Sequence, residues 1–255
     1  GTALRGAPGA GRAHPRSAAR IGGGVARVIR GLIFDFDGLI LDTEGPDYHS
    51  WREMYEGYGC SLPLDKWVGL IGTAEHGFDP YSELEFQLGR PLHRADIRAR
   101  RRARYAELVA AEVVLPGVLG YISDARRLGL RLGVASSSSR EWVIGHLERL
   151  GLLAYFDVLA CRDDVPRTKP DPALYLSALR SLGLRPDAAI AVEDSPNGIT
   201  AAKAAGLFCI AVPNELTRGL SLSRADIVLA SLAELPLEAL LVRVGHRRSG
   251  VGLVP

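Results

Sequence analysis

The chain has 255 residues, of which 47% are hydrophobic and 24% charged, and its formal net charge is +2. This length and composition suit an ordinary globular protein with one large domain, or with a core and a smaller inserted domain. So small a net charge gives no argument for a nucleic-acid partner, and no apolar run is long enough to span a bilayer. We therefore expect neither nucleic-acid binding nor a membrane partner.

The cysteines and the N-terminal segment bear on localisation. Cys60, Cys161 and Cys209 are scattered, without the spacing of a metal site or a disulfide framework, which favours the reducing cytoplasm. Residues 1–27 are rich in Ala, Gly, Arg and Pro and contain no acidic residue. Such a segment could be a transit peptide, but Gly and Pro interrupt the amphipathic helix that one needs. We expect a disordered tail there.

The first expected strand is the apolar run 28–34, which is typical of a strand buried on both faces. It ends in two aspartates, Asp35 and Asp37, and Gly38 follows directly. Neighbouring carboxylates repel each other and are costly to desolvate, so the pair implies a bound cation or a shared proton. Mg²⁺ is the natural candidate, because it takes oxygen ligands and works beside phosphate. The alternative to a metal site is an ordinary acidic turn after the strand, in which Gly38 supplies a positive φ.

Between residues 45 and 114 the strand-like runs disappear and charged segments with helical periodicity replace them. Trp51, Met54 and Tyr58 recur at the spacing of one helix face. An arginine-rich run in the last segment is interpreted as a solvated helix face, with the alternative that one or two arginines reach an anionic substrate. We expect helices over residues 47–58, 64–71, 80–88 and 94–113.

From Pro116 onward amphipathic runs alternate with apolar strands. Four runs end in a glycine at the position where a helix terminates, namely Gly129, Gly151, Gly183 and Gly206. This alternation predicts right-handed crossovers and a doubly wound parallel sheet of the α/β class, in which ligands bind beyond the carboxyl ends of the strands. We expect strands over residues 130–135, 156–160, 188–192, 207–212 and 227–230, and a last helix over 232–242.

Polar residues follow the second expected strand. Ser136, Ser137 and Ser138 come directly after it. We expect Ser138 and Glu141 to form a capping box at the start of the next helix, whose free N–H groups would suit a phosphate. Trp142 follows the box and is expected to pack under the sheet.

Two further motifs stand at equivalent places. Lys169 precedes a helix start at which we expect Asp171 as the N-cap and Pro172 as the first helical residue. Another apolar strand ends in Glu193 and Asp194, and a helix that begins with proline follows. Two strands that end in paired acids, with a serine and a lysine between them, predict one site. Carboxylates, a hydroxyl, an ammonium and a helix N-terminus together supply the charge and positioning that phosphoryl transfer requires.

These motifs resemble the signature of the haloacid dehalogenase superfamily, in the branch that includes β-phosphoglucomutase-like phosphatases. The resemblance covers residues 28–241. It implies a Rossmann-like catalytic core formed by residues 28–44 and 115–242, with an all-helical cap over residues 45–114 inserted after the first motif. Residues 1–27 and 243–255 would be tails.

The resemblance also implies residue roles. Asp35 would be the nucleophile and Asp37 the general acid/base, while Ser136 would bind phosphoryl oxygens and Lys169 would steady Asp35. Mg²⁺ would be held by Asp35, the backbone carbonyl of Asp37, Asp194 and, directly or through water, Glu193. Substrate contacts are expected from Gly38, Ser137, Ser138 and Asn197 in the core and from Gly72, Thr73, His76 and Arg101 in the cap.

The implied function is a Mg²⁺-dependent phosphatase that hydrolyses a small phosphomonoester, such as a sugar phosphate, through a phospho-aspartyl intermediate. Asp37 argues against a carbon–halogen dehalogenase, because those enzymes lack the second aspartate. A sugar-phosphate mutase is the alternative. It is disfavoured because Asp47 and Glu75 stand where the mutase grips its second phosphate, although Arg101 matches one of its cap lysines. A non-catalytic binding protein is a third possibility. The expected partner is a phosphorylated metabolite, and the expected state a monomer or weak dimer.

Overall fold

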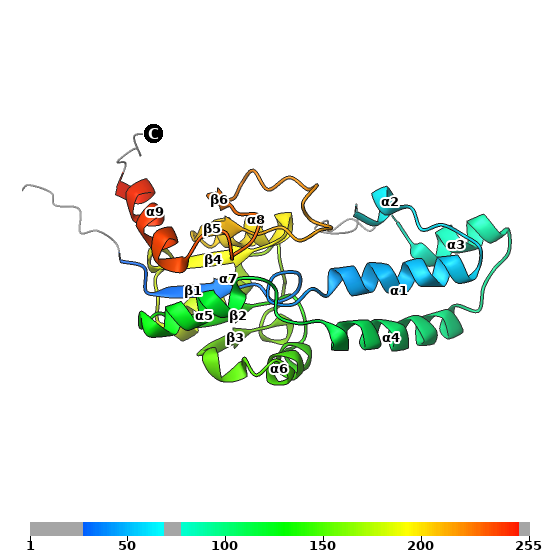
Figure 1. Ribbon diagram of the computed structural model, residues 1–255, viewed down its shortest axis with the longest axis horizontal. Coiled ribbons are helices and arrows are strands. Elements are labelled where there is room, and N and C mark those ends of the chain that lie inside the picture. The colour runs from blue at the N-terminus through cyan, green and yellow to red at the C-terminus, as the bar shows by residue number, and fades with distance from the viewer. Residues whose placement is uncertain (1–27, 69–77, 250–255) are drawn as a thin grey trace, which may run out of the picture.

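The computed structural model describes residues 28–68 and 78–249, with side chains as far as residue 245. The expected N-terminal tail and the expected cap loop with Gly72, Thr73 and His76 lie outside this part of the chain. Figure 1 shows a sheet with helices on both sides and an arm of helices extending away from it. No helix within the described ranges is both long and apolar enough to cross a membrane.

The described residues form a parallel sheet of six strands in the order β3-β2-β1-β4-β5-β6. The strand order runs outward in both directions from the pair β1–β4, as in a doubly wound α/β fold, and confirms the predicted fold class. The strands are β1 (Gly31–Phe34), β2 (Arg131–Ala135), β3 (Val158–Ala160), β4 (Ala189–Glu193), β5 (Phe208–Ala211) and β6 (Ile227–Val228).

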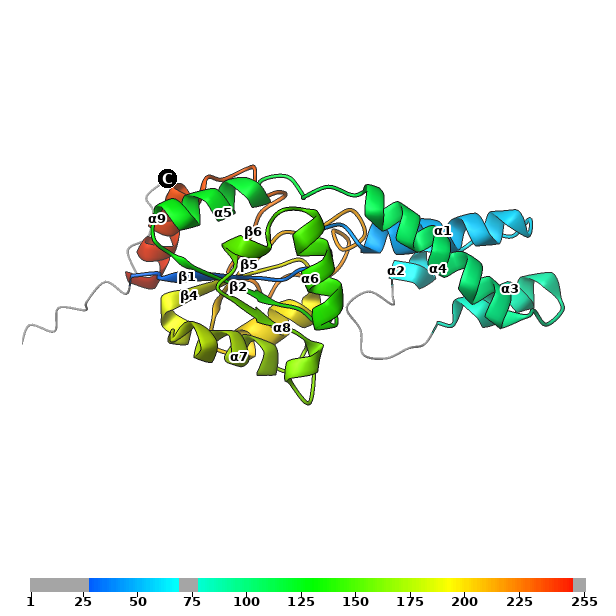
Figure 2. The ribbon, with the colours of Figure 1, turned by 90° about the horizontal axis from the view of Figure 1, so that it is seen from below.

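Helices cover both faces of the sheet (Figure 2). Along β1, Leu32 and Phe34 point into one core and Ile33 into the other, as the alternation of a strand requires. The first core is closed by α5 (Val118–Arg127), α6 (Arg140–Arg149) and α9 (Leu237–Ser249), and the second by α7 (Ala173–Leu182) and α8 (Pro196–Ala204). The glycines predicted to end helices, Gly129, Gly151, Gly183 and Gly206, all have positive φ.

The cap has a hydrophobic core of its own, which includes Trp51, Tyr55 and Ile97. The first and last cap helices, α1 and α4, run side by side away from the sheet (Figure 1). The predicted helices differ from the observed ones mainly at their ends. For example, α1 begins at Glu44, three residues before the expected start at residue 47. The cap helices are α1 (Glu44–Gly57), α2 (Leu64–Val68), α3 (Pro80–Leu88) and α4 (Arg94–Ala111).

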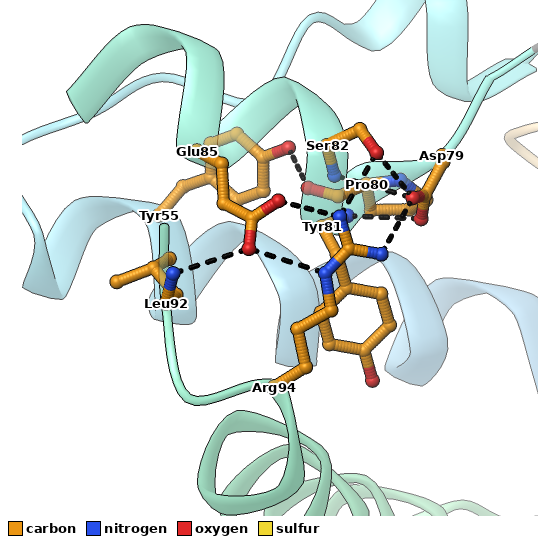
Figure 3. Close-up of polar contacts among 8 residues, drawn as sticks. All are labelled: Tyr55, Asp79, Pro80, Tyr81, Ser82, Glu85, Leu92 and Arg94. Carbon is orange, nitrogen blue, oxygen red and sulfur yellow. Dashed lines mark hydrogen bonds and ion pairs between the residues drawn. The ribbon is translucent and has the colours of Figure 1, made fainter. Parts of the chain in front are cut away.

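Polar contacts at the far end of the cap join its helices (Figure 3). Arg94, the first residue of α4, contacts Asp79 at 3.1 Å and Glu85 at 3.1 Å, which lie before and within α3. The hydroxyl of Tyr55 on α1 donates to the carbonyl of Pro80, the first residue of α3, at 2.5 Å. These contacts connect α1, α3 and α4 around the start of α3.

The prediction of the last helix was wrong in its position. It was expected over residues 232–242 with a tail from 243, but α9 spans Leu237–Ser249 and buries Val244 against the core. The reason is Pro236, because a residue before proline is disfavoured in helical conformation. The preceding segment instead forms turns around Ser231, whose hydroxyl accepts from the N–H of Ala233 at 3.1 Å.

Candidate active site

The site begins where β1 ends. Asp35 is buried, and its Oδ1 accepts from the N–H of Phe36 at 2.7 Å. The chain then turns at Gly38, which has a φ of 76°. A Cβ on Gly38 would lie 2.4 Å from Oδ2 of Asp194. Only glycine therefore allows this loop to approach the end of β4 so closely, and the turn brings the first motif against the last.

The ammonium of Lys169 joins the two strands. Its Nζ lies 2.7 Å from Oδ1 of Asp35 and 2.7 Å from Oε1 of Glu193, and its side chain is 6% exposed. Burial alone would lower the pKa of the Lys169 ammonium. The attraction of the two carboxylates is larger than this effect, so the pKa lies above its ordinary value. Lys169 is thus a fixed positive charge between the first and last motifs.

Three carboxylates converge beside this ion pair. Oxygens of Asp35, Glu193 and Asp194 lie within 4.8 Å of one another, and all three residues are buried. Burial raises the pKa of Asp35 and of Asp194 well above the ordinary value, and neighbouring acids add to the shift in both. A divalent cation would relieve that repulsion, and a buried set of oxygen donors suits a hard ion such as Mg²⁺.

The carboxylate of Asp37 points to other partners. Within the described residues it accepts four side-chain hydrogen bonds, two on each oxygen. The donors to Oδ1 are Thr43 Oγ1 at 3.1 Å and Trp142 Nε1 at 3.0 Å, and those to Oδ2 are Ser136 Oγ at 3.2 Å and Ser138 Oγ at 2.7 Å. The first two motifs thus meet directly, and Asp37 is held by elements of the core and by the start of α1.

Two predicted helix caps were wrong by one residue. Ser139, not Ser138, caps α6 and accepts from the N–H of Trp142, because the hydroxyl of Ser138 is engaged by Asp37. The predicted box with Glu141 therefore does not form. At α7 the N-cap is Pro172, and the side chain of Asp171 accepts from the N–H of Ala173 at 3.0 Å. Neither shift moves the motif residues away from the site.

Seven of the fourteen predicted site residues line one pocket of about 300 Å³. They are Asp35, Asp37, Ser137, Ser138, Lys169, Asp194 and Asn197, and Glu44, Thr168 and Ser195 join them. Arg101 does not line this pocket. It forms an ion pair with Asp47 on α1, and its guanidinium lies 5.3 Å from the ring centre of Trp51. Gly72, Thr73 and His76 cannot be placed, since they lie outside the described residues.

Several site residues escaped the sequence analysis. Asn214 donates to Oδ2 of Asp194 at 3.0 Å and to Oε2 of Glu44 at 2.8 Å, and Tyr175 donates to Oε1 of Glu193 at 2.5 Å. Asn214 is the third residue after β5, so a search that included polar residues slightly beyond each strand end could have found it. Tyr175 carries no such signal, because an aromatic residue on a core helix is ordinarily packing alone.

Gly198 on α8 offers a test of this geometry. A Cβ there would lie 1.8 Å from Oε2 of Glu193, which Lys169 and Tyr175 hold in place. We expect Gly198→Ala to destabilise the protein by about 1–3 kcal/mol through overpacking, and to weaken Mg²⁺ binding measured by calorimetry. Gly145→Ala in α6 is the matched control, because among the described residues only its chain neighbours and the backbone of its own helix can lie within 4 Å of its Cβ position. Equal effects of the two substitutions on unfolding would contradict the contact.

Glu44 predicts a pH dependence of stability. Burial raises its pKa from 4.5 to about 7, opposed by the hydrogen bond from Asn214 and increased by neighbouring acids. Between these pH values the folded protein binds a proton that the unfolded chain has released, so stability falls as pH rises. Without metal, the wild type should lose about 1–3 kcal/mol relative to Glu44→Gln between pH 5 and pH 8. Denaturant titrations of both proteins in EDTA measure this. A difference that is the same at both pH values would refute it.

Fold and site together define an α/β enzyme with a buried acidic centre at the carboxyl edge of its sheet, beside a helical cap. The sequence family described as "Haloacid dehalogenase-like hydrolase" matches residues 32–212. The "Putative phosphatase YhcW" of Bacillus subtilis (strain 168) is 46% identical over 214 residues, which are 84% of this chain and 97% of YhcW. The chain belongs to the haloacid dehalogenase-like hydrolases.

Two further similarities bear on the branch of the family. The "Phosphorylated carbohydrates phosphatase" of Thermotoga maritima is 30% identical, over 77% of this chain and 91% of that protein. A crystal structure of a "putative beta-phosphoglucomutase" from Thermotoga maritima superposes with a TM-score of 0.68 at 27% identity, over 85% of this chain and 98% of that one. The predicted class, a phosphatase of the β-phosphoglucomutase-like branch, is confirmed.

Proposed function

We propose that the protein is a Mg²⁺-dependent phosphatase that hydrolyses a small phosphomonoester, such as a sugar phosphate, through a phospho-aspartyl intermediate. The observation that carries this proposal is the position of Lys169 between Asp35 and Glu193, at the edge of the carboxylate cluster. The cluster would hold the metal through Asp35, Asp194 and Glu193, with the backbone carbonyl of Asp37. When bound, the ion supplies positive charge that offsets the phosphoryl oxygens and the carboxylates.

In the first step a carboxylate oxygen of Asp35 attacks phosphorus. Lys169 and the N–H of Phe36 fix the orientation of this carboxylate through Oδ1. As the Asp35–phosphorus bond forms, the bond to the ester oxygen breaks, and protonated Asp37 transfers its proton to the leaving alkoxide. The hydroxyls of Ser136 and Ser138 then donate to phosphoryl oxygens in place of Asp37.

In the second step the carboxylate of Asp37 removes a proton from water, and the resulting hydroxide attacks phosphorus. The Asp35–phosphorus bond breaks, inorganic phosphate leaves, and Asp37 again carries the proton needed for the next cycle. Lys169 stays paired with the regenerated carboxylate of Asp35. Asp35 is thus the nucleophile in this scheme and Asp37 the acid and then the base, and the residues needed for hydrolysis come from the core.

The cap residues favour hydrolysis over mutase chemistry. A mutase needs a cationic clamp for the second phosphate of its bisphosphorylated intermediate. In this chain Arg101 is 17% exposed and paired with Asp47, so its charge is already neutralised. We propose that the cap, residues 45–114, closes over the ester and excludes water during phosphoryl transfer.

A phosphometabolite panel tests the proposal. With Mg²⁺, release of inorganic phosphate from at least one sugar phosphate or similar monoester is expected, and EDTA should abolish it. Glucose 1-phosphate and glucose 6-phosphate should be followed for both hydrolysis and isomerisation. Isomerisation faster than phosphate release would establish the mutase instead. No turnover of any ester, p-nitrophenyl phosphate included, would favour a non-catalytic binding protein.

We also propose that the protein works in the cytoplasm, as a monomer or weak dimer. Cys60, Cys161 and Cys209 are all free thiols, which suits a reducing compartment. The proposed partner is a small phosphorylated metabolite. Size-exclusion chromatography with light scattering would test the oligomeric state, and a tight dimer at micromolar concentration would contradict it.

A further inference from the structure

Trp142 donates to Asp37 although no motif of the sequence indicated it as a site residue. It lies in the first turn of α6, and its indole N–H donates to Oδ1 of Asp37 at 3.0 Å. An indole nitrogen can only donate, so this contact is specific for an acceptor such as a carboxylate oxygen. The backbone N–H of Trp142 is held by the capping hydroxyl of Ser139. Both the backbone and the side chain of Trp142 are therefore held by hydrogen bonds at the start of α6.

The ring of Trp142 is also part of the junction between cap and core. Tyr105 of α4 lies parallel to it, with ring centres 5.9 Å apart and an interplanar angle of 8°. On the core side, His146 meets the ring edge-on at 4.2 Å. Tyr105 is in turn covered by the guanidinium of Arg101, 5.7 Å from its ring centre. One indole thus contacts Asp37 with its N–H and the cap with its face.

The other donors to Asp37 are not equally available during the reaction. Ser136 and Ser138 are needed by the phosphoryl group, as described above, and their hydroxyls leave Asp37 when they turn toward it. Thr43 directly precedes the first cap helix, so its position depends on that of the cap. Trp142 alone among the four donors belongs to a core helix, and in the part of the chain that the structure describes its single indole N–H donates to Asp37 only.

We propose that Trp142 is the positioning residue for Asp37: its indole N–H orients the carboxylate, and its stack with Tyr105 lets the cap hold the indole in that orientation. The inference rests on the proposed acid/base role of Asp37. It predicts that Trp142 acts on proton transfer and leaves phosphate binding unaffected. An effect on proton transfer can be recognised by comparing two kinds of ester. An alkyl ester needs a proton on its leaving oxygen, whereas p-nitrophenolate leaves without one.

The central experiment compares Trp142→Phe with the wild type in Mg²⁺. Phenylalanine keeps a ring for Tyr105 but lacks the N–H. For the alkyl phosphate that the wild type turns over fastest, kcat should fall about 10- to 100-fold, the loss expected for one hydrogen bond to a charged group. KM and the inhibition constant of inorganic phosphate should change less than about twofold. The loss of kcat/KM, which reports the first phosphoryl transfer, should be clearly smaller for p-nitrophenyl phosphate than for the alkyl ester, because the second step is common to both.

Three further variants complete the test. Trp67→Phe is the matched control, since it makes the same chemical change in the separate core of the cap, and its kcat should equal that of the wild type. Tyr105→Leu removes the stack from the cap side and should lower kcat in the same direction, while Tyr105→Phe restores it. Tyr105→Leu also keeps the inference testable if Trp142→Phe fails to fold.

The outcomes separate this inference from the proposed function. Equal kcat in Trp142→Phe and the wild type, or an equal loss of kcat/KM for the alkyl and the aryl ester, would overturn the role of the indole. A Tyr105→Leu variant with unchanged kcat would overturn the role of the stack. A wild type without any phosphatase activity would refute the proposed function itself.

Discussion

Asp35→Asn is expected to reduce phosphate release at least about a thousandfold, because a neutral amide cannot replace the carboxylate that we propose attacks phosphorus. The variant should still fold, without loss of thermal stability. Burial and the nearby acids raise the pKa of Asp35, so an ionised carboxylate is costly there without a metal, and a neutral isostere removes that cost. We therefore expect a melting temperature in EDTA at pH 8 equal to or above that of the wild type.

Asp124→Asn is the control for this variant. Asp124 lies on α5 and pairs with Arg127 at 2.9 Å, on the outside of the core. The same chemical change there should leave phosphate release within about twofold of the wild type, since surface ion pairs contribute little. If Asp35→Asn still released phosphate at a rate near that of the wild type, the nucleophile would have to be another residue.

Lys169→Met should have the largest effect on stability. It removes the ammonium that lies 2.7 Å from both Asp35 and Glu193 and leaves these carboxylates buried without a cation. Breaking a buried ion pair by removing one partner costs about 3–5 kcal/mol. Phosphate release should also fall at least about a hundredfold, because Asp35 loses the group that orients it.

The loss of stability should depend on pH and metal. The charge of Lys169 lowers the pKa of Asp35, so without it this carboxyl holds a proton to higher pH in the folded protein. Folded Lys169→Met then binds protons that its unfolded chain has released, and its deficit grows from pH 5 to pH 8. Added Mg²⁺ should recover part of the deficit by binding the folded state. Denaturant titrations in EDTA and in Mg²⁺ measure both effects.

A surface lysine provides the matched control. Lys66 pairs with Glu83 at 2.8 Å, but its side chain is 48% exposed. Lys66→Met should cost less than about 1 kcal/mol at either pH, because water replaces the lost partner. If Lys169→Met were no less stable than Lys66→Met, the ammonium would not be balancing buried charge, and the proposed function would lose the observation that carries it.

The four motifs could be found in the sequence because their arrangement follows from simple rules. Asp35, Ser136 and Glu193 each stand at the end of an apolar strand, and parallel strands place their carboxyl ends at one edge of the sheet. The structure pairs β1 with both β2 and β4, which brings these ends together. The parallel sheet and the meeting of distant motifs at one of its edges were thus foreseeable from hydrophobic pattern and chain direction.

Residues that act through a single contact could not be found in this way. Trp142 lies on the core helix α6 and Tyr105 on the cap helix α4. Their rings meet only because the tertiary structure brings these two helices together. The pair of Arg101 with Asp47 depends on how α1 packs against α4. Periodicity indicates which face of a helix is buried, but not which residue of another helix it will meet.

The amino-acid sequence by itself determined the doubly wound sheet, the helical insertion and the chemical groups available for phosphoryl transfer, because apolar periodicity and polar strand ends are local properties. Tertiary structure alone decided how those groups are held. It placed Lys169 between Asp35 and Glu193. It also turned Asp37 toward Trp142, and it neutralised Arg101 with Asp47. Hydrogen bonds and ion pairs require side chains to meet within about 3 Å, and only the packing of whole helices and strands sets such distances.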